Sequence, residues 1–347
     1  MAWPDADFPA DPYPGAVPPT SFVHVDEASH ALVADSRAGW CVEGVPLDTW
    51  LAAHAAAPMA GRLPVLSYGS NRCPGKITWL RRELGLGADP VVVLRARTEG
   101  VAAVWAAGLR HRDGQRPAVL AAAPGVVEQH AVWFATPEQI AVLDRCEGRD
   151  ERFRLARLRT GTVHTEDGMR VEAPWCYVGH AATRRPLLVD GAAARCADVP
   201  QAAALVLEGD AAPGDDLDAD TVTGAPHPDE WPAALFVYGL LQPGGPSWNL
   251  VAANGAGEPA RATVDGTVFD TGRGYPALRP GTGGRAAGWV VALHDPAAAL
   301  PGLDEYEGRD YRRVRLAAPD GRPMWAYTWD GPTDGMPTLA CGWPPRL

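Results

Sequence analysis

The sequence predicts an α+β protein made of two similar domains, each mainly β-structure with one or two short flanking helices. The 347 residues are enough for two or three domains of ordinary size. Hydrophobic residues make up 46% and charged residues 21%, which is typical of chains that bury a core. Gly (38) and Pro (34) together form about a fifth of the chain, which favours turns and short strands over a helical bundle.

An internal repeat is the observation that predicts two similar domains. Four blocks recur in the same order, and the Pro-Ala pair lies 30 and 31 residues before the glutamate of the third block. Matched order and spacing make chance similarity improbable, so we interpret the chain as a duplicated domain. The blocks are an apolar run ending in Tyr-Gly (64–69, 234–239), Pro-Ala (117–118, 276–277), Leu-Asp-x-x-Glu-Gly-Arg-Asp (143–150, 303–310) and Trp-x-Tyr (175–177, 325–327).

The domain boundaries follow from the repeat and from shifts in composition. Residues 1–60 are expected to form an N-terminal extension that is partly disordered, Pro-rich at first, and that could include a helix from Pro46. Residues 61–190 are the first domain and residues 232–347 the second. Between them, residues 191–231 are acidic and rich in Pro, Gly and Asp, which predicts a linker.

Short strands alternate with turns inside each repeat. Thr136 and Asp295 each precede a proline, which predicts the N-cap of a helix, and Gly148 and Gly308 suit the C-terminal cap of the same helices. Runs rich in β-branched and aromatic residues predict the strands. The strands are expected at 90–98, 126–134, 152–160, 266–270 and 311–318, and two further helices at 76–84 and 247–253.

Charge and composition exclude several classes of partner. The net charge of −11 argues against nucleic acid, and no apolar run approaches the roughly 20 residues that span a bilayer. The start of the chain has neither the basic region nor the apolar region of a secretory signal. The six cysteines form no CxxC pair and the nine histidines no metal-ligand spacing. We therefore expect a cytoplasmic protein with reduced thiols and with no metal or cofactor.

Two glutamates, Glu147 and Glu307, are the candidate catalytic groups. Each stands at the end of a short predicted helix, one residue before glycine. A single glutamate there would ordinarily face solvent and pair with the following Arg149 or Arg309. The repeat favours a functional role, because the glutamate keeps its place relative to the Tyr-Gly and Pro-Ala blocks.

The two Tyr-Gly loops are the candidate binding elements. A strand that ends in a Gly-rich loop and feeds a helix directs backbone N–H groups into a small volume, which suits a carboxylate or a developing oxyanion. An ordinary strand-to-helix turn is the alternative. The candidate substrate-binding residues are Tyr68, Gly69, Ser70 and Asn71 in the first domain and Tyr238, Gly239, Leu240 and Leu241 in the second.

These residues carry a resemblance to a known family. Tyr68-Gly-Ser-Asn71 with Leu143-Asp-x-x-Glu147-Gly resembles the γ-glutamylcyclotransferases. Val237-Tyr-Gly-Leu-Leu-x-Pro-Gly with Leu303-Asp-Glu-Tyr-Glu307-Gly resembles their γ-glutamylamine cyclotransferase branch, which includes the avirulence-induced-gene-like proteins. The resemblance covers roughly 61–180 and 232–330, and it implies that each domain is a small mixed β-barrel flanked by helices.

The resemblance also implies the chemistry. In the family the α-amine of the substrate attacks its own γ-carbonyl, which closes 5-oxoproline and expels an amine or amino acid. Such an intramolecular nucleophile has an effective molarity of ~10⁵ M or more, so no enzyme nucleophile or metal is required. Glu147 and Glu307 would be the general acid/bases, and the loops at 68–71 and 238–241 would hold the γ-glutamyl group of a small-molecule substrate.

The two domains depart from the family pattern in different ways. In the second domain, Tyr311 follows Glu307 and is a candidate substrate-binding residue. In the first domain, the aromatic residue that follows Glu147 is Phe153, which has no hydroxyl. Arg72 and Lys76 add positive charge beside the first loop only. Two alternatives remain: a tandem protein that binds a small metabolite without turnover, and an enzyme that removes a γ-glutamyl protecting group in a biosynthetic pathway.

Overall fold

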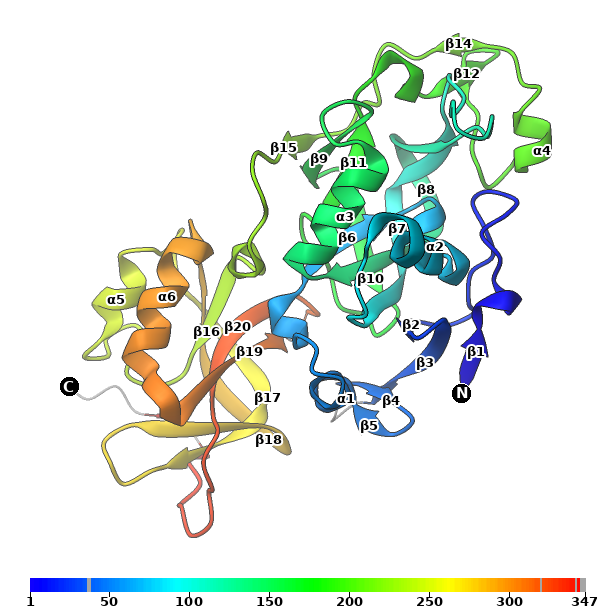
Figure 1. The fold of residues 1–347 in the computed structure, drawn as a ribbon. Helices are drawn as coiled ribbons and strands as arrows, with labels where there is room; N and C mark the ends of the chain where they lie inside the picture. The colour runs from blue at the N-terminus through cyan, green and yellow to red at the C-terminus, as the bar shows by residue number, and fades with distance from the viewer. Residues whose placement is uncertain (36–38, 319, 341, 344–347) are drawn as a thin grey trace. The chain divides into compact units, whose positions relative to one another are not determined.

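The computed structural model of the protein describes residues 1–35, 39–318, 320–340 and 342–343. Cys341, one of the six cysteines, lies outside the described residues. The chain divides into two compact units, which Figure 1 shows in blue to green and in yellow-green to red. Unit 1 comprises residues 1–34, 40–58 and 62–226, and unit 2 comprises residues 35–39, 59–61 and 227–347.

Unit 1 is organised around a buried central strand, β6. This strand pairs antiparallel with β8 and parallel with β11, and the strand order around it is β7-β8-β6-β11-β9. Trp133 of β8 and Trp175 of β11 are almost fully buried beside it. The strands are β6 (Leu63–Ser67), β7 (Val91–Trp105), β8 (Ala118–Ala135), β9 (Phe153–Leu158) and β11 (Trp175–Gly179), with β10 (Thr162–Thr165) paired to β7.

Unit 2 has the same strand order around its own central strand, β16. Here β16 pairs antiparallel with β18 and parallel with β20, in the order β17-β18-β16-β20-β19. Phe236 and Trp325 are the largest fully buried side chains of this sheet. The strands are β16 (Ala234–Val237), β17 (Ala260–Asp270), β18 (Pro276–Ala292), β19 (Tyr311–Ala317) and β20 (Pro323–Trp329).

The helices that carry the two candidate glutamates begin and end as the sequence predicts. Thr136 accepts a hydrogen bond from the backbone N–H of Gln139 at 3.3 Å, and Asp295 accepts one from Ala298 at 3.0 Å. Gly148 and Gly308 end the helices with φ of 62° and 66°, in the region that favours glycine. These helices are α3 (Pro137–Glu147) and α6 (Pro296–Glu307); the helices after the Tyr-Gly loops are α2 (Pro74–Leu84) and α5 (Trp248–Ala252).

One aspartate ties each of these helices to the sheet. The Tyr177 hydroxyl donates to Asp144 at 2.7 Å, and the Tyr327 hydroxyl donates to Asp304 at 2.8 Å. Asp144 also pairs with Arg149 at 3.1 Å. The aspartate of the Leu-Asp-x-x-Glu block therefore bonds to the tyrosine of the Trp-x-Tyr block, which gives both blocks a structural role beside any catalytic one.

The described sheets do not close into the predicted small β-barrels. A barrel requires its first and last strands to pair. In unit 1 both outer strands have other partners, because β7 pairs with β2 (Phe22–Val25) and β9 pairs with β15 (Ala219–Thr221). In unit 2 the edge strands β17 and β19 remain unpaired with each other within the described residues. Composition predicts strands but not which edges they leave open.

The N-terminal extension differs from the partly disordered segment expected from its composition. Its strand β2 (Phe22–Val25) continues the unit 1 sheet beside β7, and Phe22 and Val23 are buried there. The helix that could begin at Pro46 is present as α1 (Leu47–Ala53). The other elements are β1 (Ala2–Pro4), η1 (Asp5–Asp7), β3 (Ala28–Asp35), β4 (Gly39–Val42) and β5 (Val45–Pro46).

The segment predicted as a linker also differs from the expectation, because residues 191–226 fold as part of unit 1. The buried Arg116 donates hydrogen bonds to the carbonyls of Ala204 and Leu207, at 2.7 and 3.1 Å. Such bonds give structure to a segment with few large apolar residues. Its elements are β13 (Ala192–Ala193), α4 (Gln201–Ala204), β14 (Asp210–Ala211) and β15 (Ala219–Thr221), with β12 (Leu187–Val189) preceding them.

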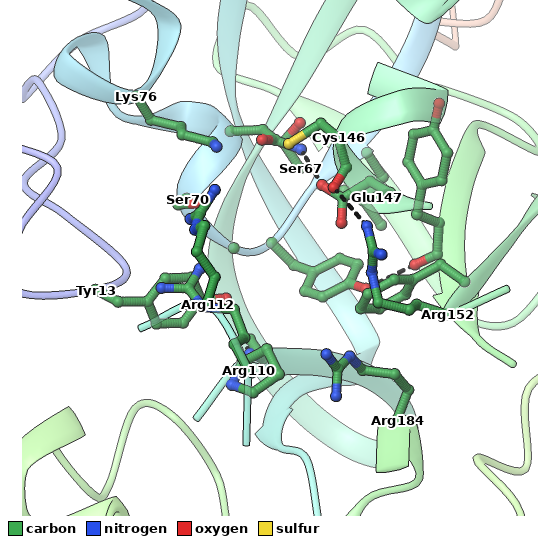
Figure 2. A pocket seen from close by; sticks show the side chains of 18 of the residues that line it. Tyr13, Ser67, Ser70, Lys76, Arg110, Arg112, Cys146, Glu147, Arg152 and Arg184 are labelled. Carbon is green, nitrogen blue, oxygen red and sulfur yellow. Dashed lines mark hydrogen bonds between the residues drawn. The ribbon is translucent and has the colours of Figure 1, made fainter. Parts of the chain in front are cut away.

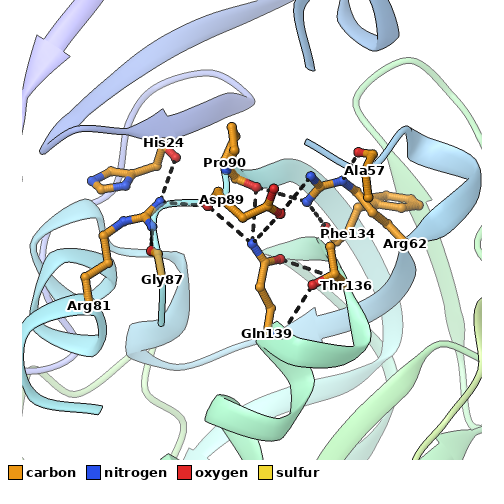
Figure 3. Close-up of polar contacts among 10 residues, drawn as sticks. All are labelled: His24, Ala57, Arg62, Arg81, Gly87, Asp89, Pro90, Phe134, Thr136 and Gln139. Carbon is orange, nitrogen blue, oxygen red and sulfur yellow. Dashed lines mark hydrogen bonds and ion pairs between the residues drawn. The ribbon is translucent and has the colours of Figure 1, made fainter. Parts of the chain in front are cut away.

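A polar network fixes the start of the central strand of unit 1, as Figure 3 shows. Arg62 is fully buried, pairs with Asp89 at 3.1 Å and donates to the Pro90 carbonyl at 2.9 Å. Gln139, in the first turn of α3, donates to the same carbonyl at 3.2 Å. Because a buried guanidinium requires partners, this network sets the position of α3 relative to β6.

Candidate active sites

Unit 2 has a pocket of about 190 Å³ where its central strand ends. All six of the residues that the sequence singled out in this domain line it: the loop Tyr238–Leu241 after β16, Glu307 at the end of α6, and Tyr311 at the start of β19. The predicted site residues of this domain therefore come together in space. The lining also includes Tyr275, Pro276, Tyr306, Asp310 and Tyr327.

Glu307 is a carboxyl of this pocket whose pKa is clearly perturbed. Burial raises the pKa of its carboxyl to about 7, because desolvation disfavours the charged form. None of the described residues that line the pocket is Lys, Arg or His. A carboxyl with a pKa near 7 exchanges its proton readily at neutral pH, which suits a general acid/base.

Two tyrosine hydroxyls of this pocket are bonded to backbone carbonyls. Tyr238 donates to the Tyr327 carbonyl at 2.9 Å, and Tyr311 donates to the Pro276 carbonyl at 2.6 Å. Tyr311 packs edge-on against Trp329, with ring centroids 5.3 Å apart. These tyrosines consequently shape the wall of the pocket, and their hydroxyl protons are engaged in the absence of ligand.

The Tyr238-Gly239 turn combines a steric requirement with available donors. A Cβ on Gly239 would lie 2.9 Å from Cγ of Pro276, closer than side chains tolerate. Among the described residues, the backbone N–H groups of Gly239 and Leu240 have no hydrogen-bond acceptor. Two adjacent free N–H groups next to a carboxyl acid form an arrangement suited to an oxyanion.

Unit 1 has a larger pocket, about 340 Å³, at the corresponding end of β6 (Figure 2). The predicted residues Tyr68, Gly69, Ser70, Asn71 and Glu147 all line it. The Tyr68 hydroxyl makes the same kind of hydrogen bond as that of Tyr238, because it donates to the Tyr177 carbonyl at 2.6 Å. The predicted loop at 68–71 and the predicted Glu147 therefore come together in this pocket as well.

Glu147 differs from Glu307 in having a side-chain donor. Nδ2 of Asn71 donates a hydrogen bond to Oε1 of Glu147 at 2.8 Å. Leu241 occupies the matching position of the Tyr-Gly loop in unit 2 and offers no donor. The carboxylate of Glu147 is thus held in one orientation by the loop that it faces.

The aromatic residues that follow the two glutamates are structurally equivalent. Phe153 is the first residue of β9 and pairs with Gly179, whereas Tyr311 is the first residue of β19 and pairs with Trp329. The two extra residues in unit 1 are taken up in the turn before β9, where Asp150 has a φ of 66°. Phe153 accordingly lines the unit 1 pocket without a hydroxyl.

Sequence reasoning missed much of the unit 1 pocket. Of the two basic residues expected there, Lys76 lines it, but Arg72 is not among the lining residues and donates to the Gln129 carbonyl at 2.7 Å. The N-terminal extension supplies Tyr13, whose hydroxyl accepts a hydrogen bond from the Ala118 N–H at 2.9 Å. No motif marks the missed basic residues, which are Arg110, Arg112, Arg152 and Arg184.

In the part of the chain that the structure describes, no three or more His, Cys, Asp or Glu side chains are grouped so that they could hold a metal ion. No helix in that part combines the length and the apolar character needed to cross a bilayer.

Each unit is therefore an α+β domain with a pocket between a Tyr-Gly loop and a helix-terminal glutamate. Residues 235–344, which belong to unit 2, match the family described as gamma-glutamyl cyclotransferase, AIG2-like. The resemblance seen in the sequence is thereby confirmed for these residues. No curated protein gives a significant match.

Solved structures share only limited likeness. An AIG2-like protein from Mus musculus is 22% identical over 31% of this chain and 86% of its own, with a TM-score of 0.28. Protein ytfP from Escherichia coli is 27% identical over 32% of this chain and 94% of its own, with a TM-score of 0.24. Allophanate hydrolase from Kluyveromyces lactis is 14% identical over 64% of this chain and 31% of its own, with a TM-score of 0.27. Scores this low do not extend the family assignment beyond residues 235–344.

Proposed function

We propose that unit 2 is a cyclotransferase that converts a γ-glutamyl amine into 5-oxoproline and a free amine. The observation that carries the proposal is Glu307, whose pKa is raised to about 7 by burial, in one pocket with the Tyr238–Leu241 loop. The family match over residues 235–344 supports the same general class of activity.

In the proposed mechanism, the carboxylate of Glu307 accepts a proton from the α-ammonium group of the substrate. The freed amine attacks the γ-carbonyl carbon, forming a C–N bond and a tetrahedral oxyanion. When the oxyanion collapses, the original amide C–N bond breaks, and Glu307 donates its proton to the departing nitrogen. The ring nitrogen, which carries a second proton after the new C–N bond forms, passes that proton to the regenerated carboxylate or to water, which leaves neutral 5-oxoproline and the free amine. One carboxyl therefore serves as base and then as acid, for which a pKa near neutrality is favourable.

The backbone N–H groups of Gly239 and Leu240 are proposed to stabilise the oxyanion. Their lack of an acceptor among the described residues supports this role. Donors fixed by the backbone need little reorganisation as charge develops, and loss of one such donor typically costs 10²–10³ in rate. The aromatic wall around Tyr311 would exclude water from the reacting atoms and so favour cyclisation over hydrolysis.

The test is incubation of the full chain with a panel of γ-glutamyl amines and dipeptides, followed by mass spectrometry for 5-oxoproline. Glu307→Gln should lower kcat by about 10²–10⁴. Glu305→Gln is the matched control, because Glu305 lies two residues earlier on α6 and is exposed. Release of free glutamate in place of 5-oxoproline would identify a hydrolase and overturn the proposal.

We further propose that unit 1 is a duplicate of unit 2 in which Glu147 takes the part of Glu307. The identical order of five strands, the paired Tyr-to-carbonyl bonds of Tyr68 and Tyr238, and the Asp–Tyr bonds of both units support a common origin. Glu147→Gln should remove turnover in unit 1 alone, and the double variant with Glu307→Gln should be nearly inactive. Wild-type turnover in the double variant would exclude both assignments.

Two alternatives keep the same pockets. Removal of a γ-glutamyl protecting group would use the same chemistry with a different departing amine, and the substrate panel would distinguish it by the preferred amine. A binding protein would retain the substrate unchanged. Tight binding of γ-glutamyl compounds by both wild type and the double variant, without any 5-oxoproline, would favour the binding protein.

A further inference from the structure

The unit 1 pocket contains an excess of positive charge that its proposed acid/base does not explain. Beside His111, five lysine and arginine side chains line it, against the single carboxylate of Glu147 among the described lining residues. They are Lys76, Arg110, Arg112, Arg152 and Arg184. Lys76 is also the single lysine of a chain that otherwise uses arginine for its basic residues.

Three of these five cations have no carboxylate partner. Arg110 and Arg112 share Asp113, at 2.8 and 3.3 Å. Within the described residues, by contrast, Lys76, Arg152 and Arg184 form no ion pair. Their contacts are neutral: the Lys76 ammonium lies 3.5 Å from the Trp79 ring centroid, and Arg152 donates to the Cys146 carbonyl at 3.1 Å.

Two of the unpaired cations are also deeply buried. Lys76 is 7% exposed and Arg184 is 5% exposed, and Nε of Arg184 has no hydrogen-bond partner. Burial lowers the pKa of Arg184, and the nearby Arg152 and Arg110 lower it further, whereas the charge of Glu147 acts to raise it. Because an unpaired buried charge is costly, such groups are normally matched by an opposite charge. Among the described residues that line this pocket only Glu147 is acidic, so the lining supplies fewer negative charges than positive ones.

The cations lie on different walls of the pocket. Lys76 projects from α2, whereas Arg184 is the last residue of η4 (Ala182–Arg184) and Arg152 precedes β9. Figure 2 shows Lys76 and Arg184 on opposite sides of the pocket, with Glu147 at a height between them. A compact anion would reach one of these positions, whereas a molecule with two separated anionic groups would reach both.

The unit 2 pocket provides an internal comparison. Its lining holds two carboxylates, Glu307 and Asp310, and no Lys, Arg or His. The excess of cations is therefore a feature of unit 1 and not of the shared fold. If both pockets held the same ligand, their opposite charge would be difficult to explain.

We propose that the unit 1 pocket binds a small molecule with two separated anionic groups, such as a dicarboxylate, one group held by Lys76 and the other by Arg184 and Arg152. This inference rests on the unit 1 pocket being a ligand site, as in the proposed function, but it requires no turnover there. The volume of about 340 Å³ suits a molecule of this size.

The test is calorimetric titration of the full chain at constant ionic strength. The probes are malonate, succinate, glutarate and adipate, each compared with the monocarboxylate of the same carbon number, and inorganic phosphate as a compact anion. The best dicarboxylate should bind about tenfold tighter than its monocarboxylate or more, since charge-assisted bonds exceed neutral ones. It should also bind tighter than phosphate.

Variants localise the effect. Arg184→Met and Lys76→Met should each lower the dicarboxylate affinity at least about tenfold, and Arg184→Lys should restore most of it. Arg82→Met is the control, because Arg82 is an exposed arginine on the same helix as Lys76. Since Lys76 is the single lysine, acetylation followed by peptide mass spectrometry gives an independent readout, and the bound dicarboxylate should protect it.

Three results would overturn the inference. Equal affinity for the dicarboxylates and their monocarboxylates would show that the pocket does not bind a second anionic group. Phosphate binding as tight as that of the best dicarboxylate would show that the ligand does not need two separated anionic groups. Dicarboxylate binding abolished by Glu307→Gln but unaffected by Arg184→Met would place the ligand in unit 2. None of these measurements depends on formation of 5-oxoproline, so this inference and the proposed function can fail separately.

Discussion

Nδ2 of Asn71 donates a 2.8 Å hydrogen bond to Oε1 of Glu147, and the matching loop position in unit 2 is Leu241. The two glutamates therefore occupy different surroundings at the same place in the fold. Glu147 faces an amide donor in a pocket lined by cations, whereas Glu307 lies in a cation-free pocket where burial raises its pKa to about 7. The differences predict distinct ligands for the two units.

Replacing Asn71 by Asp tests the contact with Glu147. Two carboxyls at hydrogen-bond distance cannot both ionise readily, so the pair has a raised pKa in the folded state. Such a group favours the folded state below the unfolded pKa and loses that contribution as pH rises. The stability deficit of Asn71→Asp should therefore be about 1–3 kcal/mol larger at pH 8 than at pH 5, measured by urea denaturation.

Asn71→Ala is the control for that experiment. It removes the donor without adding a charge, so its deficit should vary much less with pH. A deficit of Asn71→Asp that is constant between pH 5 and 8 would mean that the two side chains do not touch in solution.

Glu307 should make the stability of unit 2 depend on pH. Its carboxyl has a folded pKa of about 7, above the ordinary value of 4.5, so burial favours the protonated form. The contribution to stability is complete below about pH 4.5 and is lost as pH rises through 7. Relative to wild type, Glu307→Gln should thus gain up to about 3 kcal/mol between pH 4.5 and pH 8.

Chemical denaturation of both proteins across this pH range measures the difference, with the exposed Glu305→Gln as the matched variant. Parallel pH curves for wild type and Glu307→Gln would show that Glu307 titrates normally in the folded protein.

The sequence was informative about the elements near each pocket and less so about their surroundings. Capping residues such as Thr136 and Gly148 act locally, and the helices they bound are present as predicted. The pairing of β2 with β7 and of β15 with β9 depends on contacts between distant residues, which composition does not encode. For that reason the prediction of closed barrels was wrong, and the N-terminal extension and the predicted linker differ from expectation.

The same distinction applies to the sites. Glu147, Glu307 and the Tyr-Gly loops were found because the repeat fixed their spacing. Arg152 and Arg184 belong to no repeated block, and one arginine is not distinguishable from another in a chain so rich in them. Their importance depends on where a turn after α3 and a short helix after β11 place them, which only the folded structure reveals.

The bond between the motif aspartate and the buried tyrosine should stabilise each unit separately. Tyr327→Phe removes the donor to Asp304, and Tyr177→Phe removes the donor to Asp144, so each should cost about 1–3 kcal/mol. Differential scanning calorimetry should show that each variant lowers the transition of its own unit. Tyr306→Phe is the control, because the Tyr306 hydroxyl contacts Ser247 on the surface and should contribute little. A single transition lowered equally by both variants would contradict independent units.

Glu128 should make unit 1 sensitive to acid. Although burial acts to raise its pKa, the His130 ring 3.2 Å away and hydrogen bonds from the Ala103 N–H and Arg195 hold the pKa of Glu128 at about 2. Arg195 provides two of these bonds, at 2.8 and 3.1 Å. A carboxyl with a lowered folded pKa contributes stability above its unfolded pKa of about 4.5 and loses it as pH falls towards 2. Glu128→Gln should accordingly cost about 3 kcal/mol at pH 7 and much less at pH 3.

Thermal denaturation of wild type and Glu128→Gln between pH 7 and pH 3 measures this dependence. The matched variant is Glu151→Gln, since Glu151 is exposed in the same unit and should change stability little at any pH. The two-bond contact with Arg195 also predicts that Arg195→Met reproduces most of the loss at pH 7, because the buried carboxylate would then lack its cation. Should the Glu128→Gln deficit stay constant down to pH 3, the carboxyl would not be ionised in the folded protein, and the contacts around it would have to act through packing alone.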